Sequence, residues 1–235
     1  MIDKKDATSM TSKVLWGEGL FLRPQHFQQQ DQYHEHRLHE SVKALHPYAW
    51  GVHQLQVDRD ALANNTLRVL ELSLRFQDGE LYDAPLADHL PDTVDLSQLL
   101  QSQQTVTFYA ALPAFKPFGG NFNPAGQTNN AARFQQANRD TPDLYTQAAQ
   151  AQLAYLKATV RLVSEFEPRD SYSHFPLLRL RRVATGGFEL DPAFVAPSLS
   201  IRSAPILFLQ LRRLVDARKR KPPHCTVTTA NRATT

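Results

Sequence analysis

The segment Leu67-Arg68-Val69-Leu70-Glu71-Leu72-Ser73-Leu74-Arg75-Phe76-Gln77-Asp78-Gly79 decides the fold class of this 235-residue chain. Its apolar residues occupy alternate positions with one change of phase: Leu67, Val69, then Leu70, Leu72, Leu74 and Phe76. A period of two residues is typical of a β-strand with one buried face. The change of phase at Val69-Leu70 predicts a bulge or bend. Asp78-Gly79 predicts a hairpin turn that leads into a return strand at 80–83.

The same strand pattern recurs over most of the chain. Further strands are predicted at 51–57, 105–112, 156–166 and 175–183, and a return strand at 188–190. A 3.6-residue period predicts helices over 25–44 and 204–217. The apolar face of the first helix is expected to contain Phe27, Leu38, Val42 and Leu45, with His34 beside them. Short antiparallel strands with helices at both ends predict a mainly β fold of the sandwich type.

The net charge of +3 comes from 26 Lys and Arg against 23 Asp and Glu, and it is unevenly distributed. Residues 218–235 hold five basic residues and no acidic ones, so the remainder has 21 basic against 23 acidic residues, a net −2. A nucleic-acid binder that works through this tail is one alternative, but the tail has no aromatic residue for stacking, and we predict no nucleic-acid partner. The sequence has no run of about 18 apolar residues, so no membrane insertion is predicted.

Histidines concentrate near the N-terminus, where six of nine lie between His26 and His53. On a helix, His36, His39 and Glu40 share a face, so a metal-dependent enzyme is a second alternative. The string His34-Glu35-His36-Arg37-Leu38-His39 departs from the zinc-protease motif HExxH because position 38 is Leu. A solvated or interface helix is the favoured interpretation. We predict no metal, no cofactor and no catalytic residues, because nucleophile elbows and phosphate loops are also absent from the sequence.

Aromatic residues gather in the segments 16–22 and 47–51. Two interpretations stay open for them, core packing and a protein-binding surface, because Trp, Tyr and Arg are enriched in interface hot spots. The candidate interface residues are Trp16, Leu20, Phe21, Arg23, Phe27, Tyr48 and Trp50.

These segments also carry a family resemblance. Val14-Leu15-Trp16-Gly17-Glu18-Gly19-Leu20-Phe21-Leu22-Arg23-Pro24-Gln25-His26-Phe27-Gln28-Gln29-Gln30-Asp31-Gln32-Tyr33 resembles the start of the TssK family, baseplate subunits of the bacterial type VI secretion system. Leu45-His46-Pro47-Tyr48-Ala49-Trp50-Gly51 resembles the next block of that family. The resemblance implies a cytoplasmic, non-enzymatic homotrimer whose β-sandwich shoulder is like that of siphophage receptor-binding proteins. It also implies TssF and TssG wedge proteins as partners, a helical neck, and a head that binds the membrane complex.

The resemblance suggests how the chain is divided. We expect a disordered N-terminus at 1–12, a shoulder domain at 13–190 with a long loop insertion at 113–150, and a linker with the start of the neck at 191–217. The basic low-complexity tail at 218–235 is expected to be foreign to the family, for example out of frame. Because family members are about twice as long, we expect a truncated chain that lacks the head and membrane-complex binding.

Overall fold

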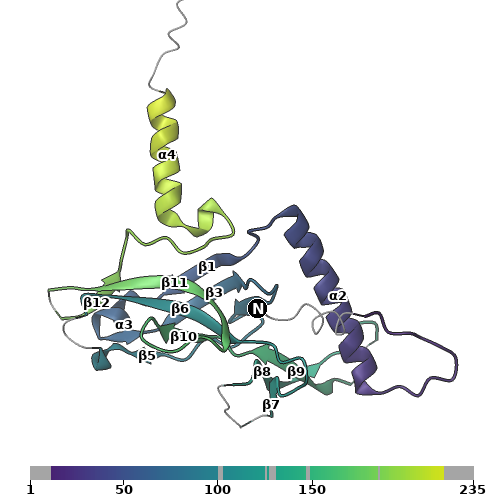
Figure 1. The fold of residues 1–235 in the computed structure, drawn as a ribbon. Helices are drawn as coiled ribbons and strands as arrows, with labels where there is room; N and C mark the ends of the chain where they lie inside the picture. Colours follow the sequence, from purple (N-terminus) through teal and green to yellow (C-terminus); the bar gives the residue numbers. More distant parts are fainter. Residues whose placement is uncertain are drawn as a thin grey trace, which may run out of the picture.

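Two antiparallel sheets pack face to face in the computed structural model, which describes residues 12–99, 103–124, 126, 131–146, 149–184 and 186–219 (Figure 1). The first sheet has the order β1-β3-β4, from β1 (Gly51–Val57), β3 (Val69–Arg75) and β4 (Leu81–Ala84). The second has the order β10-β6-β11-β12, from β6 (Thr105–Pro113), β10 (Arg161–Ser164), β11 (Tyr172–Arg182) and β12 (Phe188–Leu190). This arrangement confirms the predicted β-sandwich. The predictions for 1–11 and for 220–235 lie outside the described residues.

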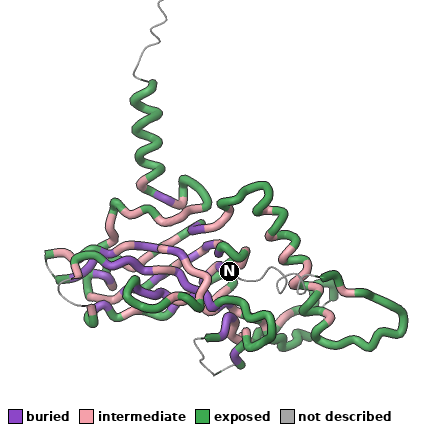
Figure 2. Tube along the Cα trace, viewed as in Figure 1, coloured by how far each residue is buried: buried purple, intermediate pink, exposed green. Residues whose placement is uncertain are grey.

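One hydrophobic core lies between the two sheets, as the buried segments in Figure 2 show. Alternate side chains of β3 enter it from one side, and those of β6 and β11 enter it from the other. Across the core, the ring centroids of Phe76 and Phe175 lie 5.6 Å apart in an edge-to-face arrangement. Burying a Leu or Phe side chain contributes about 1.5–3 kcal/mol, so this interior accounts for most of the driving force for folding.

The predicted change of phase in the opening segment is a β-bulge. Val57 pairs with Val69 and Gln56 pairs with Glu71, which leaves Leu70 without a partner in the β1–β3 register. Leu70 is accordingly exposed, whereas Val69 is buried. The bulge therefore lets both halves of the strand pattern face the same core.

The predicted hairpin turn between β3 and β4 is also confirmed. Phe76 N donates to Glu80 O at 2.9 Å, and Gly79 N donates to Phe76 O at 3.1 Å. Gly79 has a φ of 98°, a left-handed conformation that glycine adopts without steric cost. Two distant parts of the chain contact this turn, one through His39 and the other through Arg133.

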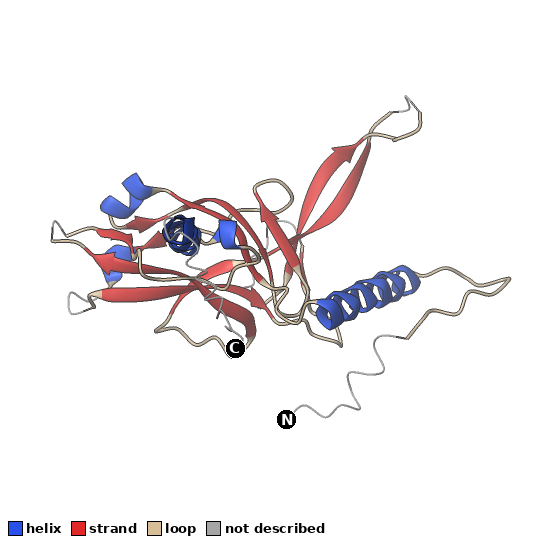
Figure 3. Ribbon diagram, turned by 90° about the horizontal axis from the view of Figure 1, so that it is seen from above, coloured by secondary structure: helices blue, strands red, loops and turns tan. Residues whose placement is uncertain are grey.

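A projecting β-ribbon occupies part of the region expected to be loop. β8 (Phe134–Thr141) pairs antiparallel with β9 (Ala151–Ala158), and β7 (Phe122–Asn123) pairs parallel with the start of β8. The prediction of a loop is therefore wrong over 134–141. Of the residues of β8 and β9 only Ala158 is buried, so the ribbon lacks the apolar alternation of a strand with one buried face. Figure 3 shows the ribbon leaving the sandwich.

Short elements complete the sandwich. A five-residue helix, α3 (Arg59–Ala63), was not predicted, and it begins at Asp58, whose carboxylate accepts hydrogen bonds from Asp60 N and Ala61 N. The 3₁₀ turn η2 (Leu96–Gln98) begins at Asp95, whose carboxylate accepts a hydrogen bond from Ser97 N at 2.9 Å. The remaining short elements are β2 (Thr66–Leu67), β5 (Val94–Asp95) and η3 (Ile201–Ser203).

The two predicted long helices are present as α2 (Pro24–Leu45) and α4 (Pro205–Lys219). The predicted face of α2 is wrong except at Val42, because Leu38 is 66% and Leu45 76% exposed, and Phe27 and His34 are exposed as well. Val42 is half-buried, together with His26, Gln30, His36 and His39. The reason is that α2 packs near the polar β3–β4 turn and does not enter the core. Neither α2, α4 nor any other helix of the described ranges has the length and apolar character to cross a membrane.

Candidate protein interface

Residues 12–50, here called the N-terminal arm, lie on the outside of the sandwich (Figure 2). None of these residues is buried, although many are large and apolar. The exposed ones are Leu15, Trp16, Leu20, Phe21, Leu22, Phe27, Leu38, Leu45 and Tyr48. A monomeric protein seldom leaves so many large apolar side chains in water over one segment, and such surfaces are typical of binding sites.

The first half of the arm folds back on the start of α2. The Trp16 ring lies 6.1 Å from the His26 ring and 6.3 Å from the Phe27 ring, measured between centroids. Arg23 is the N-cap of α2, where its main-chain N–H donates to His26 Nδ1 at 3.1 Å and Pro24 takes the first helical position. This packing fixes Trp16 and Phe27 as one cluster, while Phe21 extends into solvent with 80% exposure.

The two aromatic residues of the second segment have different environments. The Trp50 ring packs edge-to-face on buried Phe175 at 5.7 Å and belongs to the rim of the core. Tyr48, two residues earlier, is 84% exposed. Core packing is therefore the right interpretation for Trp50. The assignment of Trp16, Leu20, Phe21, Arg23, Phe27 and Tyr48 to an interface stays a prediction.

The C-terminal half of α2 contacts the sandwich through His39 and Arg75. Arg75 Nη2 lies 3.3 Å from His39 Nδ1, and Arg75 Nη1 donates to Ala49 O at 3.2 Å. The same imidazole lies against Gly79, where a Cβ atom would overlap it. Burial and the nearby Arg75 charge lower the pKa of His39 below its ordinary value, because both disfavour the imidazolium form.

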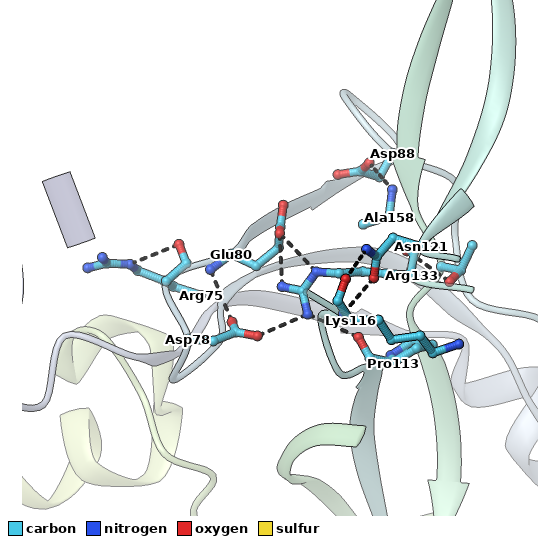
Figure 4. Close-up of polar contacts among 11 residues, drawn as sticks. Arg75, Asp78, Glu80, Asp88, Pro113, Lys116, Asn121, Arg133 and Ala158 are labelled. Atoms are coloured by element: carbon cyan, nitrogen blue, oxygen red, sulfur yellow. Dashed lines mark hydrogen bonds and ion pairs between the residues drawn. The ribbon is translucent and has the colours of Figure 1, made fainter. Parts of the chain in front are cut away.

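A buried arginine joins the β8–β9 ribbon to the β3–β4 turn (Figure 4). The side chain of Arg133 is 4% exposed; its Nη1 lies 3.0 Å from Asp78 Oδ2, and its Nη2 lies 2.9 Å from Glu80 Oε2. Its Nη1 also donates to Pro113 O at 3.0 Å. Desolvation raises the pKa of Glu80, although Arg133 acts in the opposite direction. A single arginine between Ala132 and Phe134 gives no signal of this role in the sequence.

The histidines of α2 do not converge on a common point. His39 Nε2 lies 3.8 Å from Glu40 Oε1, and its Nδ1 faces Arg75, which repels a cation. Within the part of the chain that the structure describes, no group of three or more His, Cys, Asp or Glu could hold a metal ion. The hypothesis of a metal-dependent enzyme built on His36, His39 and Glu40 therefore gains no support from the geometry.

Comparison with known proteins places this fold. Residues 26–230 match the model of a family described as bacterial type VI secretion, VC_A0110, EvfL, ImpJ, VasE. A curated relative, the type VI secretion system baseplate component TssK1 of Pseudomonas aeruginosa, is 27% identical over 201 residues. That alignment covers 85% of this chain but only 45% of the relative. The chain thus spans less than half the length of this curated relative.

Solved structures agree with this placement. A chain of a cryo-electron microscopy structure titled as the TssK-TssF-TssG baseplate subcomplex has a TM-score of 0.83 and 29% identity, over 89% of this chain and 69% of that chain. A chain of a type VI baseplate complex has a TM-score of 0.79 and 27% identity, over 91% of this chain and 71% of that one. A crystal structure of TssK at 22% identity, with a TM-score of 0.77 over 89% of this chain and 48% of that chain, supports the fold.

The family match and the sequence resemblance differ at their limits. The match begins at residue 26, inside the first resembling block, and it continues to residue 230. The resemblance was expected to stop at Ala217, so the match reaches 13 residues into the segment expected to be foreign. Matched residues make up most of the chain, and the solved relatives share its fold at TM-scores of 0.77 to 0.83. This chain belongs to the TssK (VasE) family of bacterial type VI secretion proteins.

Proposed function

We propose that this chain is a non-enzymatic structural subunit of a type VI secretion baseplate that docks onto wedge proteins of the TssF and TssG type. The observation that carries the proposal is the likeness to a chain of the TssK-TssF-TssG subcomplex, with a TM-score of 0.83 and 29% identity over 89% of this chain. This likeness is an analogy at the level of the fold, so the docking surface is argued from this chain's own residues.

The N-terminal arm is the surface we assign to wedge docking. Its exposed Trp16–Phe27 cluster, together with Phe21 and Tyr48, offers aromatic anchors of the kind that dominate interface energetics. Arg23 lies beside this cluster at the start of α2 and can pair with a carboxylate of the partner. Trp50 packs on Phe175 and so attaches the end of the arm to the core.

The helix α4 is the element we assign to trimer formation. Leu207, Leu211 and Leu214 are between 38% and 69% exposed, and Phe208 and Val215 add apolar surface beside them. A helix with apolar residues around much of its circumference needs partners to cover them. Figure 1 shows α4 standing clear of the sandwich, where copies from other subunits could reach it. Light scattering of the chain and of Leu211→Asp tests this, since only the unaltered chain should have the mass of a trimer.

The family resemblance also implies a cytoplasmic subunit that links the baseplate to the membrane complex. We propose the same place and role for the assembled subunit. The absence of membrane-complex binding by a chain of these 235 residues stays a prediction. A pull-down of the membrane components by this chain would contradict it.

Co-purification tests wedge docking directly. The tagged chain, expressed with TssF and TssG from the same genome, should recover both proteins. Phe21→Asp should reduce recovery at least tenfold, because it places a charge in the proposed contact. Phe118→Asp is the matched control, since Phe118 is 96% exposed and lies outside the arm. Recovery of neither wedge protein by the folded, unaltered chain would reject the proposed function.

A further inference from the structure

A cleft of about 290 Å³ lies between the C-terminal half of α2 and the first sheet. Its lining includes His39, Lys43 and His46 from the arm, Arg75 from the end of β3, and Gln77 from the turn that follows. Pro47, Ala49 and Trp50 supply an apolar wall. Small-molecule sites usually enclose about 300–1,000 Å³, so this volume suits one or two side chains better than a cofactor.

The charge of this arm cleft is one-sided. Its lining residues include two permanent cations and two histidines, but no Asp or Glu. The guanidinium of Arg75 has only neutral acceptors, which are Ala49 O at 3.2 Å, Gly79 O at 3.5 Å and the ring of His39 at 3.3 Å. Within the described residues no carboxylate forms an ion pair with Arg75.

The carboxylates closest to the cleft are already engaged. Asp78 lies 3.0 Å from Arg133 Nη1, on the other side of the β3–β4 turn. Glu40 lies 3.7 Å from Lys43 Nζ, but both side chains are more than half exposed, so this contact is weak and can be exchanged. A partly enclosed Arg75 without a counter-charge therefore favours an incoming anion.

We infer that the arm cleft binds a short acidic segment of a partner polypeptide, with an Asp or Glu carboxylate at Arg75 and Lys43 and an apolar residue against Trp50. The charge complementarity argues for the carboxylate, and the Pro47–Trp50 wall argues for an apolar neighbour. A nucleic-acid strand would need positive charge along successive phosphates, whereas this cleft concentrates its charge at one point. The inference deepens the proposed function, on which it rests for a polypeptide partner, because Pro47 in the cleft wall adjoins exposed Tyr48, one of the arm residues assigned to wedge docking.

Trp50 provides a direct signal for the test. The chain has two tryptophans, so Trp16→Phe leaves Trp50 as the single indole. The full chain with this change is titrated with the blocked peptide Gly-Glu-Leu-Glu-Gly and with its Gln counterpart Gly-Gln-Leu-Gln-Gly at low salt. The Glu peptide should change Trp50 emission saturably, and the Gln peptide should bind about tenfold or more weakly, as expected for the loss of charge-assisted hydrogen bonds.

Three variants locate the binding. Lys43→Gln and Arg75→Gln should each weaken the Glu peptide about tenfold, whereas the matched change Lys13→Gln in an exposed residue outside the cleft should not. Arg75 also donates hydrogen bonds to Ala49 O and Gly79 O, so Arg75→Gln removes those contacts as well. His46→Gln is a further variant in the cleft that leaves them intact. Any one of three results would overturn the inference. The first is equal affinity for the Glu and Gln peptides, and the second is no change of Trp50 emission at millimolar peptide. The third is tighter binding of oligo(dT) through Lys43.

The two proposals fail in different ways. If the unaltered chain recovers TssF and TssG but the Glu peptide does not bind, only the acidic-segment inference falls. If the chain recovers neither wedge protein, the proposed function falls, whatever the peptide does. If Lys43→Gln lowers both peptide affinity and wedge recovery, the acidic segment belongs to a wedge protein.

Discussion

Arg133 and Glu80 form an ion pair between the base of the β8–β9 ribbon and the β3–β4 turn, across 53 positions of sequence (Figure 4). Arg133 Nε and Nη2 both donate to Glu80 Oε2, at 3.2 and 2.9 Å. Together with Asp78 and Pro113 O, this contact gives each of the three nitrogens of an almost completely buried guanidinium a partner. The ribbon has few buried apolar residues of its own, so its attachment to the sandwich depends strongly on this arginine.

Replacing Arg133 with methionine should destabilise the fold. The change keeps an unbranched side chain but leaves Asp78 and Glu80 without their cation and Pro113 O without its donor. Breaking a buried pair costs about 3–5 kcal/mol, and we expect the lower end because both carboxylates retain some contact with water. The free energy of unfolding in urea measures this loss.

Arg181→Met is the matched control for that measurement. Arg181 pairs with Glu189 at 2.5 Å, but both side chains are about half exposed. Exposed pairs contribute little, so this variant should remain close to the unaltered chain. Equal losses for the two arginines would show that the Arg133 contacts do not hold the ribbon.

Much of the sandwich could be predicted from the sequence because its strands have one solvent-exposed face and one buried face. The Leu67–Phe76 alternation, its bulge at Leu70 and the Asp78-Gly79 turn are all consequences of local pattern. The β8–β9 ribbon could not be predicted in this way. None of the residues of β8 is buried, so nothing in its pattern distinguishes it from a polar loop, and only the end of β9, from residue 156, lies in a predicted strand.

The candidate interface could be predicted only in part, because exposure depends on distant partners. Tyr48 and Trp50 lie two residues apart, yet Phe175, far later in the chain, packs against Trp50, whereas Tyr48 is 84% exposed. The same limit applies to α2, whose apolar residues suggested the wrong face. Helical periodicity shows which residues share a face, but it does not show which face the tertiary structure covers.

Acidification should loosen the attachment of α2 through His39. The folded chain lowers the pKa of His39 below its ordinary value of 6.5, so at pH values between the two the unfolded chain binds more protons. The His39 contribution to stability is therefore present above about pH 6.5 and is lost as the pH falls through the lowered pKa of the folded chain. Urea unfolding at pH 7.5 and 5.5 should show a smaller loss for His39→Gln than for the unaltered chain. His53→Gln, at an exposed position, is the control, and identical pH dependence of all three chains would contradict the prediction.

Phe175 should be one of the most sensitive positions of the core. Its ring lies 5.6 Å from that of Phe76 and 5.7 Å from that of Trp50, and it is 2% exposed. Phe175→Ala should lower the free energy of unfolding by about 3–5 kcal/mol, because it leaves a cavity that these rings cannot fill. It should also shift Trp50 emission to the red by admitting water. Phe118→Ala, at a 96% exposed position, should change neither quantity, and a Phe175→Ala chain as stable as this control would refute the packing of the three rings.

Gly51→Ala should detach the segment before α4 from the first sheet. Gly51 has a φ of 122°, and a Cβ atom there would lie 2.5 Å from Pro197 O. That carbonyl accepts a hydrogen bond from Val52 N at 2.8 Å, and Leu199 N donates to Val52 O at 2.9 Å, so the clash falls on the contacts that fix this segment. Gly119→Ala is the control that measures the backbone strain alone. Gly119 has a φ of 99°, but no atom lies within 4 Å of a Cβ added there, so the substitution causes no steric clash. The control should lose about 1–2 kcal/mol from its backbone conformation alone, and Gly51→Ala should lose clearly more in urea unfolding. Equal losses would mean that the Pro197 contact does not hold the segment in place.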